Sequence, residues 1–61
     1  MSIKVDILNY LKGKDWTYID DIAIDLLQLK SKKETAFDLA YKSLVSEGRL
    51  ELLGNQVKII D

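Results

Sequence analysis

The chain has 61 residues, and its nine Lys and Arg against ten Asp and Glu give a formal net charge of −1 at pH 7. A sequence of this length forms one domain, residues 1–61, which buries only about 60% of the surface that its unfolded form exposes. Cysteine and histidine are absent. Their absence excludes disulfides, thiolate chemistry and zinc sites of the Cys/His kind, and it removes the commonest general base.

Apolar runs are short throughout the chain and do not approach the roughly 20 residues that span a bilayer. The start Met1-Ser2-Ile3 lacks the charged and apolar regions of a signal peptide. We therefore expect a cytoplasmic protein with no membrane partner. A chain of this size that starts at Met-Ser suggests a small stand-alone protein, and a domain cut from a longer protein is the alternative.

The first expected element is a helix from Ser2, a good N-cap residue, to about Lys12. Gly13 follows and can end it. One side of this helix is apolar and faces the core, with Ile3, Ile7, Leu8 and Leu11.

The next stretch, Trp16 to Tyr18, has the β-branched and aromatic character of a short strand. Thr17 and Asp20 have the spacing of a capping box, which predicts a second helix from about Tyr18 to Gln28. Its buried positions are Ile19, Ile22, Ala23 and Leu26.

The third helix is predicted over residues 32–47. Ser31 and Glu34 form a second capping-box pair, and Gly48 is the expected left-handed terminator. Its apolar stripe consists of Phe37, Ala40, Tyr41 and Leu44. Leu29-Lys30 is then a tight turn, so the second and third helices cross steeply, as in a helix-turn-helix unit.

Beyond Gly48 the apolar period changes from 3.6 to 2, which predicts a β-hairpin. A two-residue turn at Gly54-Asn55 pairs Leu50 with Ile59, Glu51 with Lys58, Leu52 with Val57 and Leu53 with Gln56. This register puts both aliphatic pairs on one face and a Glu51/Lys58 ion pair on the other. A hairpin alone is marginally stable, so the strand at Trp16 to Tyr18 is its expected third member.

Four stretches occur in this order of elements: residues 17–23 (Thr-Tyr-Ile-Asp-Asp-Ile-Ala), 26–29 (Leu-Leu-Gln-Leu), 41–44 (Tyr-Lys-Ser-Leu) and 47–50 (Glu-Gly-Arg-Leu). The markers are the isoleucine-alanine pair of the second helix, the leucine four residues before the terminating glycine, and the hairpin after it. Over essentially the whole chain, this pattern resembles the winged helix-turn-helix superfamily. The resemblance implies an α+β fold of three helices and a small antiparallel sheet with a C-terminal hairpin wing.

The resemblance also implies a transcription regulator that binds double-stranded DNA, with the third helix in the major groove and the wing on the backbone or minor groove. Few cations are available to one domain, so we expect a homodimer on two half-sites. Carried over by position, the DNA-binding residues are Thr17, Tyr18, Lys30, Lys32, Lys33, Thr35, Lys42, Arg49 and Lys58. The outer face of the third helix also includes Asp38, Leu39 and Ser43.

A second hypothesis is a protein-interaction or dimerisation module that keeps the fold without DNA binding. Asp38 and Leu39 stand where DNA-binding members tend to place Arg, Ser, Asn or Gln. Four aliphatic residues fall outside the predicted core stripes and are the candidate interface: Ile24, Leu39, Leu53 and Ile60.

Enzyme activity is not expected. Asp20 and Asp21 are adjacent on a helix and point about 100° apart, so they do not converge on a substrate. Ser31 is explained as a helix cap, and the isolated glycines do not form a phosphate-binding loop. We predict no catalytic residue, metal, cofactor or small-molecule substrate.

Overall fold

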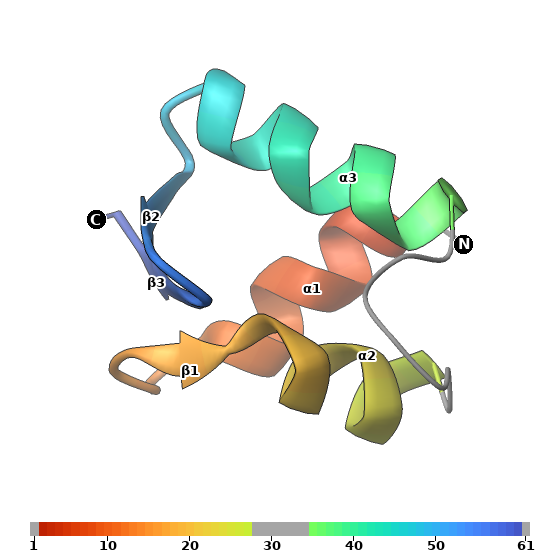
Figure 1. The fold of residues 1–61 in the computed structure, drawn as a ribbon, viewed down its shortest axis with the longest axis horizontal. Coiled ribbons are helices and arrows are strands. Elements are labelled where there is room, and N and C mark those ends of the chain that lie inside the picture. Colours follow the sequence, from red (N-terminus) through yellow and green to blue (C-terminus); the bar gives the residue numbers. More distant parts are fainter. Residues whose placement is uncertain (1, 28–34, 61) are drawn as a thin grey trace.

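The structure is a computed structural model that describes residues 2–27 and 35–60. Over these ranges it is an α+β fold (Figure 1), as predicted. The elements in chain order are α1 (Ile3–Leu11), β1 (Thr17–Tyr18), α2 (Ile19–Leu27), α3 (Thr35–Ser46), β2 (Leu50–Leu53) and β3 (Gln56–Ile59).

Helix α1 begins as its sequence predicts. The hydroxyl of Ser2 accepts a hydrogen bond from the backbone N–H of Val5, at 3.5 Å. The helix ends at Leu11, one residue before the predicted end, and Lys12 is its C-cap. Its inner side buries Ile7 and Leu11 completely.

Helix α2 begins at Ile19 and not at Tyr18 because Tyr18 is part of β1. The N–H of Ile19 donates to the carbonyl oxygen of Asn55 in the hairpin turn, at 2.9 Å. The short strand and the helix therefore meet without a loop, and α2 is held directly against the hairpin.

Helix α3 is described from Thr35 to Ser46. Its predicted first turn, the Ser31/Glu34 capping box and the Leu29-Lys30 turn lie outside the described residues. The C-terminal end is a Schellman motif: the N–H of Gly48 donates to Val45 and that of Arg49 donates to Leu44. Gly48 has a φ of +77°, so the predicted left-handed terminator is confirmed.

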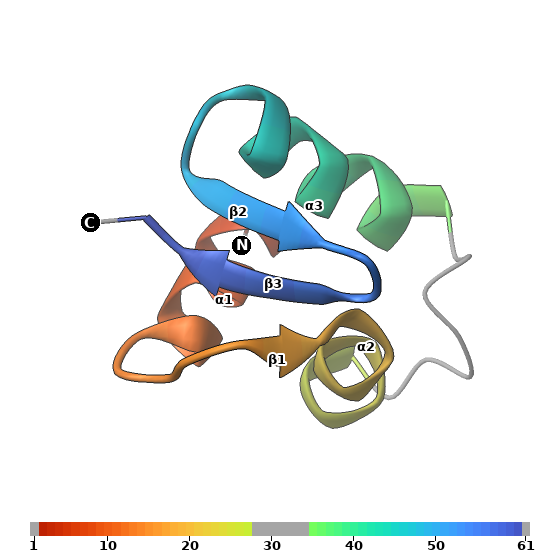
Figure 2. The same cartoon turned by 60° about the vertical axis from the view of Figure 1, so that its left-hand side comes forward.

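The three strands form one antiparallel sheet in the order β1-β3-β2. Figure 2 shows this sheet in front with the helices behind it. All four predicted hairpin pairs are confirmed, from Leu50 opposite Ile59 to Leu53 opposite Gln56. The predicted third strand is also confirmed, since Thr17 lies opposite Val57.

Two details of the hairpin prediction are wrong. Leu52 was expected on the buried face with Val57, but its side chain is 44% exposed. In the described sheet Val57 lies on the central strand, whereas Leu52 lies on an edge strand that pairs on one side only. Glu51 forms no ion pair within the described ranges, because the ammonium of Lys58 lies 3.8 Å from a carboxylate oxygen of Asp15 instead.

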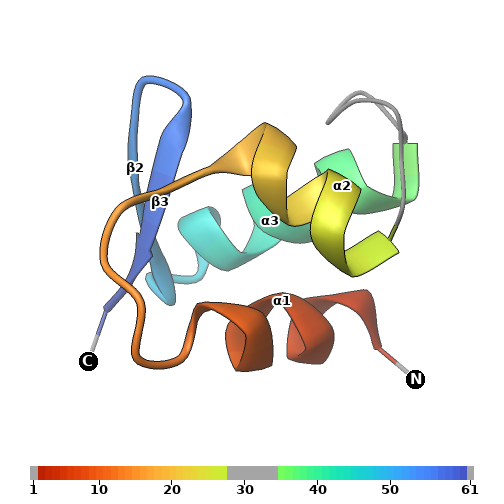
Figure 3. The ribbon, with the colours of Figure 1, turned by 90° about the horizontal axis from the view of Figure 1, so that it is seen from below.

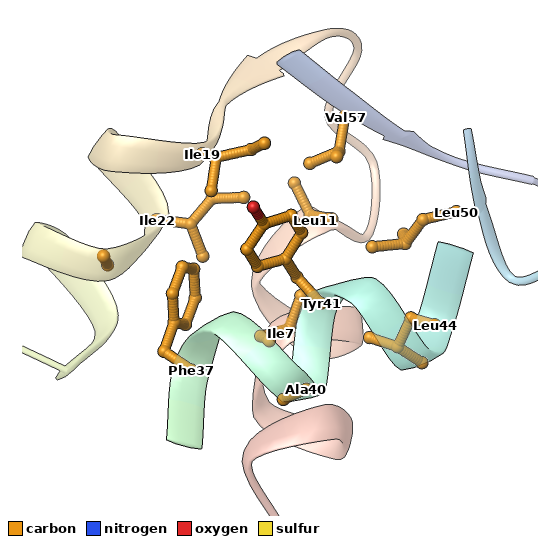
Figure 4. Packing of buried hydrophobic residues seen from close by; sticks show 11 residues of the cluster. Ile7, Leu11, Ile19, Ile22, Phe37, Ala40, Tyr41, Leu44, Leu50 and Val57 are labelled. Carbon is orange, nitrogen blue, oxygen red and sulfur yellow. The ribbon is translucent and has the colours of Figure 1, made fainter. Parts of the chain in front are cut away.

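Every element contributes to a single hydrophobic core (Figure 4), except β1. Tyr41 of α3 lies in the middle of this cluster, and its ring centroid is 5.5 Å from that of Phe37. The remaining buried residues come from α1, α2, α3 and the hairpin: Ile7, Leu11, Ile19, Ile22, Ala23, Ala40, Leu44, Leu50 and Val57. In the described part of the chain, none of the helices has the length and apolar character of a membrane span.

Candidate functional site

The outer face of α3 lies opposite its buried stripe. Phe37, Ala40, Tyr41 and Leu44 are buried, while the exposed positions of α3 are Ala36, Leu39, Lys42 and Ser46. Leu39 is the most exposed large apolar residue of the described helices, at 62%. Because α1 packs against the buried side of α3, this outer face points away from α1 and is open to a partner.

Lys42 is the one cation that the described part of α3 carries, and it is already paired. Its ammonium lies 2.9 Å from a carboxylate oxygen of Asp38, one helical turn earlier. The hydrogen bond to Asp38 and the negative charge of that carboxylate raise the pKa of Lys42 above its ordinary value. Asp38 thus cancels much of the positive charge that this face could offer to phosphate.

Ser43 was predicted on the outer face of α3 but turns toward α1. Its hydroxyl donates to the carboxylate of Glu47 at 3.0 Å, and the same carboxylate accepts from the ammonium of Lys4. The hydrogen bonds from Lys4 and then Ser43 lower the pKa of Glu47. These three side chains join α1 to the end of α3, so Ser43 has a structural role here.

Thr17 and Tyr18 lie on different faces of the sheet. Thr17 shares a row with buried Val57, and its hydroxyl donates to the carbonyl oxygen of Asp15 at 2.9 Å. Tyr18 is exposed and lies in a row across the sheet with Gln56 and Leu53. Of the two, Tyr18 is the one whose side chain is accessible to a partner.

Arg49 and Lys58 come together with residues of α1 and of the loop that follows it. Together with Lys12 and Lys14 they line a surface groove of about 480 Å³, which we call the α1–sheet groove. Its other lining residues are Val5, Leu8, Asn9, Gly13 and Ile59. Sequence reasoning did not select Lys12 or Lys14, although residues 5, 8, 9 and 12 have the spacing of one continuous helix face.

The remaining predicted DNA-binding residues lie just before α3 in the sequence or at its first described position. Lys30, Lys32 and Lys33 are outside the described residues. Thr35 is the first described residue of α3, and only its backbone is described. Their predicted role therefore stays a prediction.

The four residues of the alternative interface are all exposed, as predicted. Leu53 is the most exposed, at 68%, and Ile24, Leu39 and Ile60 also have large exposed fractions. They come from different parts of the fold, namely α2, α3, β2 and the residue after β3.

A contact between Tyr10 and Asp25 joins α1 to α2 at the surface. The phenol donates to the carboxylate at 2.8 Å, and this hydrogen bond is the main cause of a raised pKa for Tyr10. The ammonium of Lys14 lies 4.8 Å from the centre of the same ring, as in a cation–π contact. These contacts hold α2 against α1, and we assign them a structural role.

Within the described ranges, no group of three or more acidic residues is placed to hold a metal ion. The chain matches no family model, no curated protein and no solved structure.

Proposed function

We propose that the chain is a small winged-helix protein that binds double-stranded DNA as a transcription regulator, with α3 as the helix that enters the major groove. The order of the elements carries this proposal. A short strand precedes two helices and a hairpin follows them, and that strand pairs with the second strand of the hairpin. In such an arrangement α3 and the hairpin can both reach one duplex.

The outer face of α3 supports the proposal sterically, since Ala36, Leu39, Lys42 and Ser46 are exposed. Electrostatic support comes from the sequence just before this helix, where Lys30, Lys32 and Lys33 follow one another closely. Lysines at this end of a helix act together with its dipole on a phosphate. One protomer then neutralises about three to five phosphates, so we expect two protomers to bind two half-sites.

Fluorescence anisotropy with labelled 24-base-pair duplexes tests the proposal at about 20, 60 and 200 mM salt. We expect binding at low salt that weakens as salt rises, with a slope of about −0.9 for each neutralised phosphate. The double variant Lys32→Gln/Lys33→Gln should reduce the magnitude of that slope by about 2. Binding that is absent at low salt, or that does not respond to salt, is evidence against a DNA-binding role.

The exposure of Ile24, Leu39, Leu53 and Ile60 favours a second candidate function, a protein-interaction or dimerisation module. Light scattering of the wild type and of Leu39→Lys separates the two candidates. A dimer in the wild type that becomes a monomer in the variant supports an apolar interface at α3. If both proteins are monomers, self-association through Leu39 is excluded.

A further inference from the structure

The α1–sheet groove has two walls that come from opposite ends of the chain. Val5, Leu8 and Asn9 recur on one face of α1 and form the first wall together with the C-cap residue Lys12, while Arg49, Lys58 and Ile59 belong to the hairpin side. Figure 3 shows the C-terminal end of α1 and the open end of the hairpin on the same side of the molecule. The groove therefore exists only in the folded protein, and its volume of about 480 Å³ is typical of a ligand site.

Positive charge lines both walls of this groove. Lys12 and Lys14 follow α1, Arg49 and Lys58 belong to the hairpin side, and none of the described lining residues is acidic. Lys58 is partly neutralised by Asp15, and Lys14 lies over the ring of Tyr10.

Lys12 and Arg49, by contrast, form no ion pair with a described residue. Two cations that form no ion pair with a described residue thus line one groove, although the charge of Arg49 also acts on Glu47, in a chain whose net charge is −1.

The rest of the lining is largely aliphatic. Val5 is exposed although it is apolar, and Leu8 and Ile59 are half-buried beside it. A ligand that matches this surface needs an apolar group for the aliphatic residues. It also needs at least two separate anionic groups, because Lys12 and Arg49 stand on different walls.

We propose that the α1–sheet groove binds an acidic peptide segment of a partner protein, which places one aliphatic side chain between flanking carboxylates. The aliphatic side chain packs on Val5, Leu8 and Ile59. The carboxylates on its two sides meet Lys12 and Arg49.

Other anionic ligands match the groove less well. A fatty acid has a single carboxylate, which can pair with the cation of one wall only. Nucleic acid supplies charge along its backbone but has no aliphatic side chain for the apolar lining. The inference goes beyond DNA binding by α3, because none of the groove residues belongs to α3.

The probe for the test is a labelled pentapeptide with a central leucine, two acidic residues on each side and blocked ends. In one matched peptide, Asn and Gln replace the acidic residues, and in the other glycine replaces the leucine. Titration into the full ¹⁵N-labelled chain at low salt is followed by NMR. We expect the acidic leucine peptide to shift the amides of Val5, Lys12, Gly13 and Ile59, and to bind about fivefold or more tightly than either matched peptide.

Variants of the groove residues then test the assignment. Lys12→Gln and Arg49→Gln should each weaken binding about twofold to fivefold, since exposed ion pairs have this strength. Val5→Thr keeps the shape of the side chain at an exposed position and should weaken binding through the lost apolar contact. Lys42→Gln makes the same charge change on α3 and should leave the peptide affinity as in the wild type.

Four results would overturn the proposal. The first is that the amide signals of the groove residues do not shift at millimolar peptide, and the second is that the neutral peptide binds as tightly as the acidic leucine peptide. The third is that Lys42→Gln loses as much peptide affinity as Lys12→Gln. The fourth is that another anion binds more tightly than the peptide and shifts the same amide signals. For the last comparison, the anions are octanoate and a single-stranded oligothymidylate of 12 nucleotides. None of these results depends on whether α3 binds a duplex, so the two proposals fail separately.

Discussion

The ammonium of Lys4 in α1 donates a hydrogen bond to the carboxylate of Glu47, which lies 43 residues later and just after α3. Ser43 donates to the same carboxylate from one turn earlier in α3. The beginning of α1 is thereby tied to the end of the helix that packs on it. Both hydrogen bonds favour the ionised carboxylate, which is why the pKa of Glu47 is lowered.

Glu47 should make the stability of the fold depend on acid pH. Because its pKa is lower in the folded chain, its stabilising effect is complete above the ordinary glutamate value of 4.5. The effect is lost as the pH falls through the lowered pKa. We expect Glu47→Gln to reduce the urea midpoint at pH 7 and to flatten its dependence on pH below 4.5. Glu51→Gln is the control, since Glu51 is exposed and forms no ion pair with described residues. If both variants change the urea midpoint and its pH dependence equally, the lowered pKa of Glu47 does not contribute to stability.

Leu50 and Leu53 provide a matched pair for the hairpin. Both are leucines of β2, but Leu50 is 1% exposed and Leu53 is 68% exposed. Leu50→Ala should cost about 2–5 kcal/mol of unfolding free energy, a large part of the roughly 3–9 kcal/mol of a domain this size. Leu53→Ala should cost about 0.5 kcal/mol or less. Urea denaturation followed by circular dichroism measures both, and similar losses would show that the register is not the one described.

The register was predictable from the sequence because a shift by one residue would bury Glu51 and expose Leu50. The core stripes of the helices were predictable for a similar reason, since Phe37 and Leu44 recur on one helix face. Burial decides local patterns of this kind. A buried charge or an exposed core residue lowers the free energy of unfolding by about 1 kcal/mol or more.

The partners of long charged side chains were not predictable. Lys58 was assigned to Glu51 across the hairpin, yet it reaches Asp15 in the loop before β1. Such exposed pairs differ by less than about 1 kcal/mol, so nothing in the sequence selects one of them. The α1–sheet groove was missed for a related reason, because Lys12 and Arg49 are 37 positions apart in the chain and only the fold brings them to the two walls of one groove.

Gly48 should be sensitive to substitution although its surroundings are open. A Cβ atom at this position meets no other atom within 4 Å, so any cost comes from the backbone, whose φ is +77°. We expect Gly48→Ala to lose about 1–2 kcal/mol, because L-residues are strained in the left-handed region. Asparagine tolerates this region better, so Gly48→Asn should lose clearly less. Thermal melts of the three proteins decide this, and an alanine variant as stable as the wild type contradicts the Schellman end of α3.

Asp38 should weaken DNA binding if α3 enters the major groove. Its carboxylate lies 2.9 Å from the ammonium of Lys42 and faces the phosphates that this lysine would contact. In Asp38→Asn the charge of Lys42 is no longer cancelled, so we expect duplex affinity to rise about threefold at low salt and the salt slope to steepen by about 0.9. Asp6→Asn is the control, because it removes the same charge from the first turn of α1, which packs on the buried side of α3. Anisotropy titrations of both variants measure the effect. A gain of the same size in Asp6→Asn would mean that only net charge matters, and no gain in Asp38→Asn would mean that the outer face of α3 does not contact DNA.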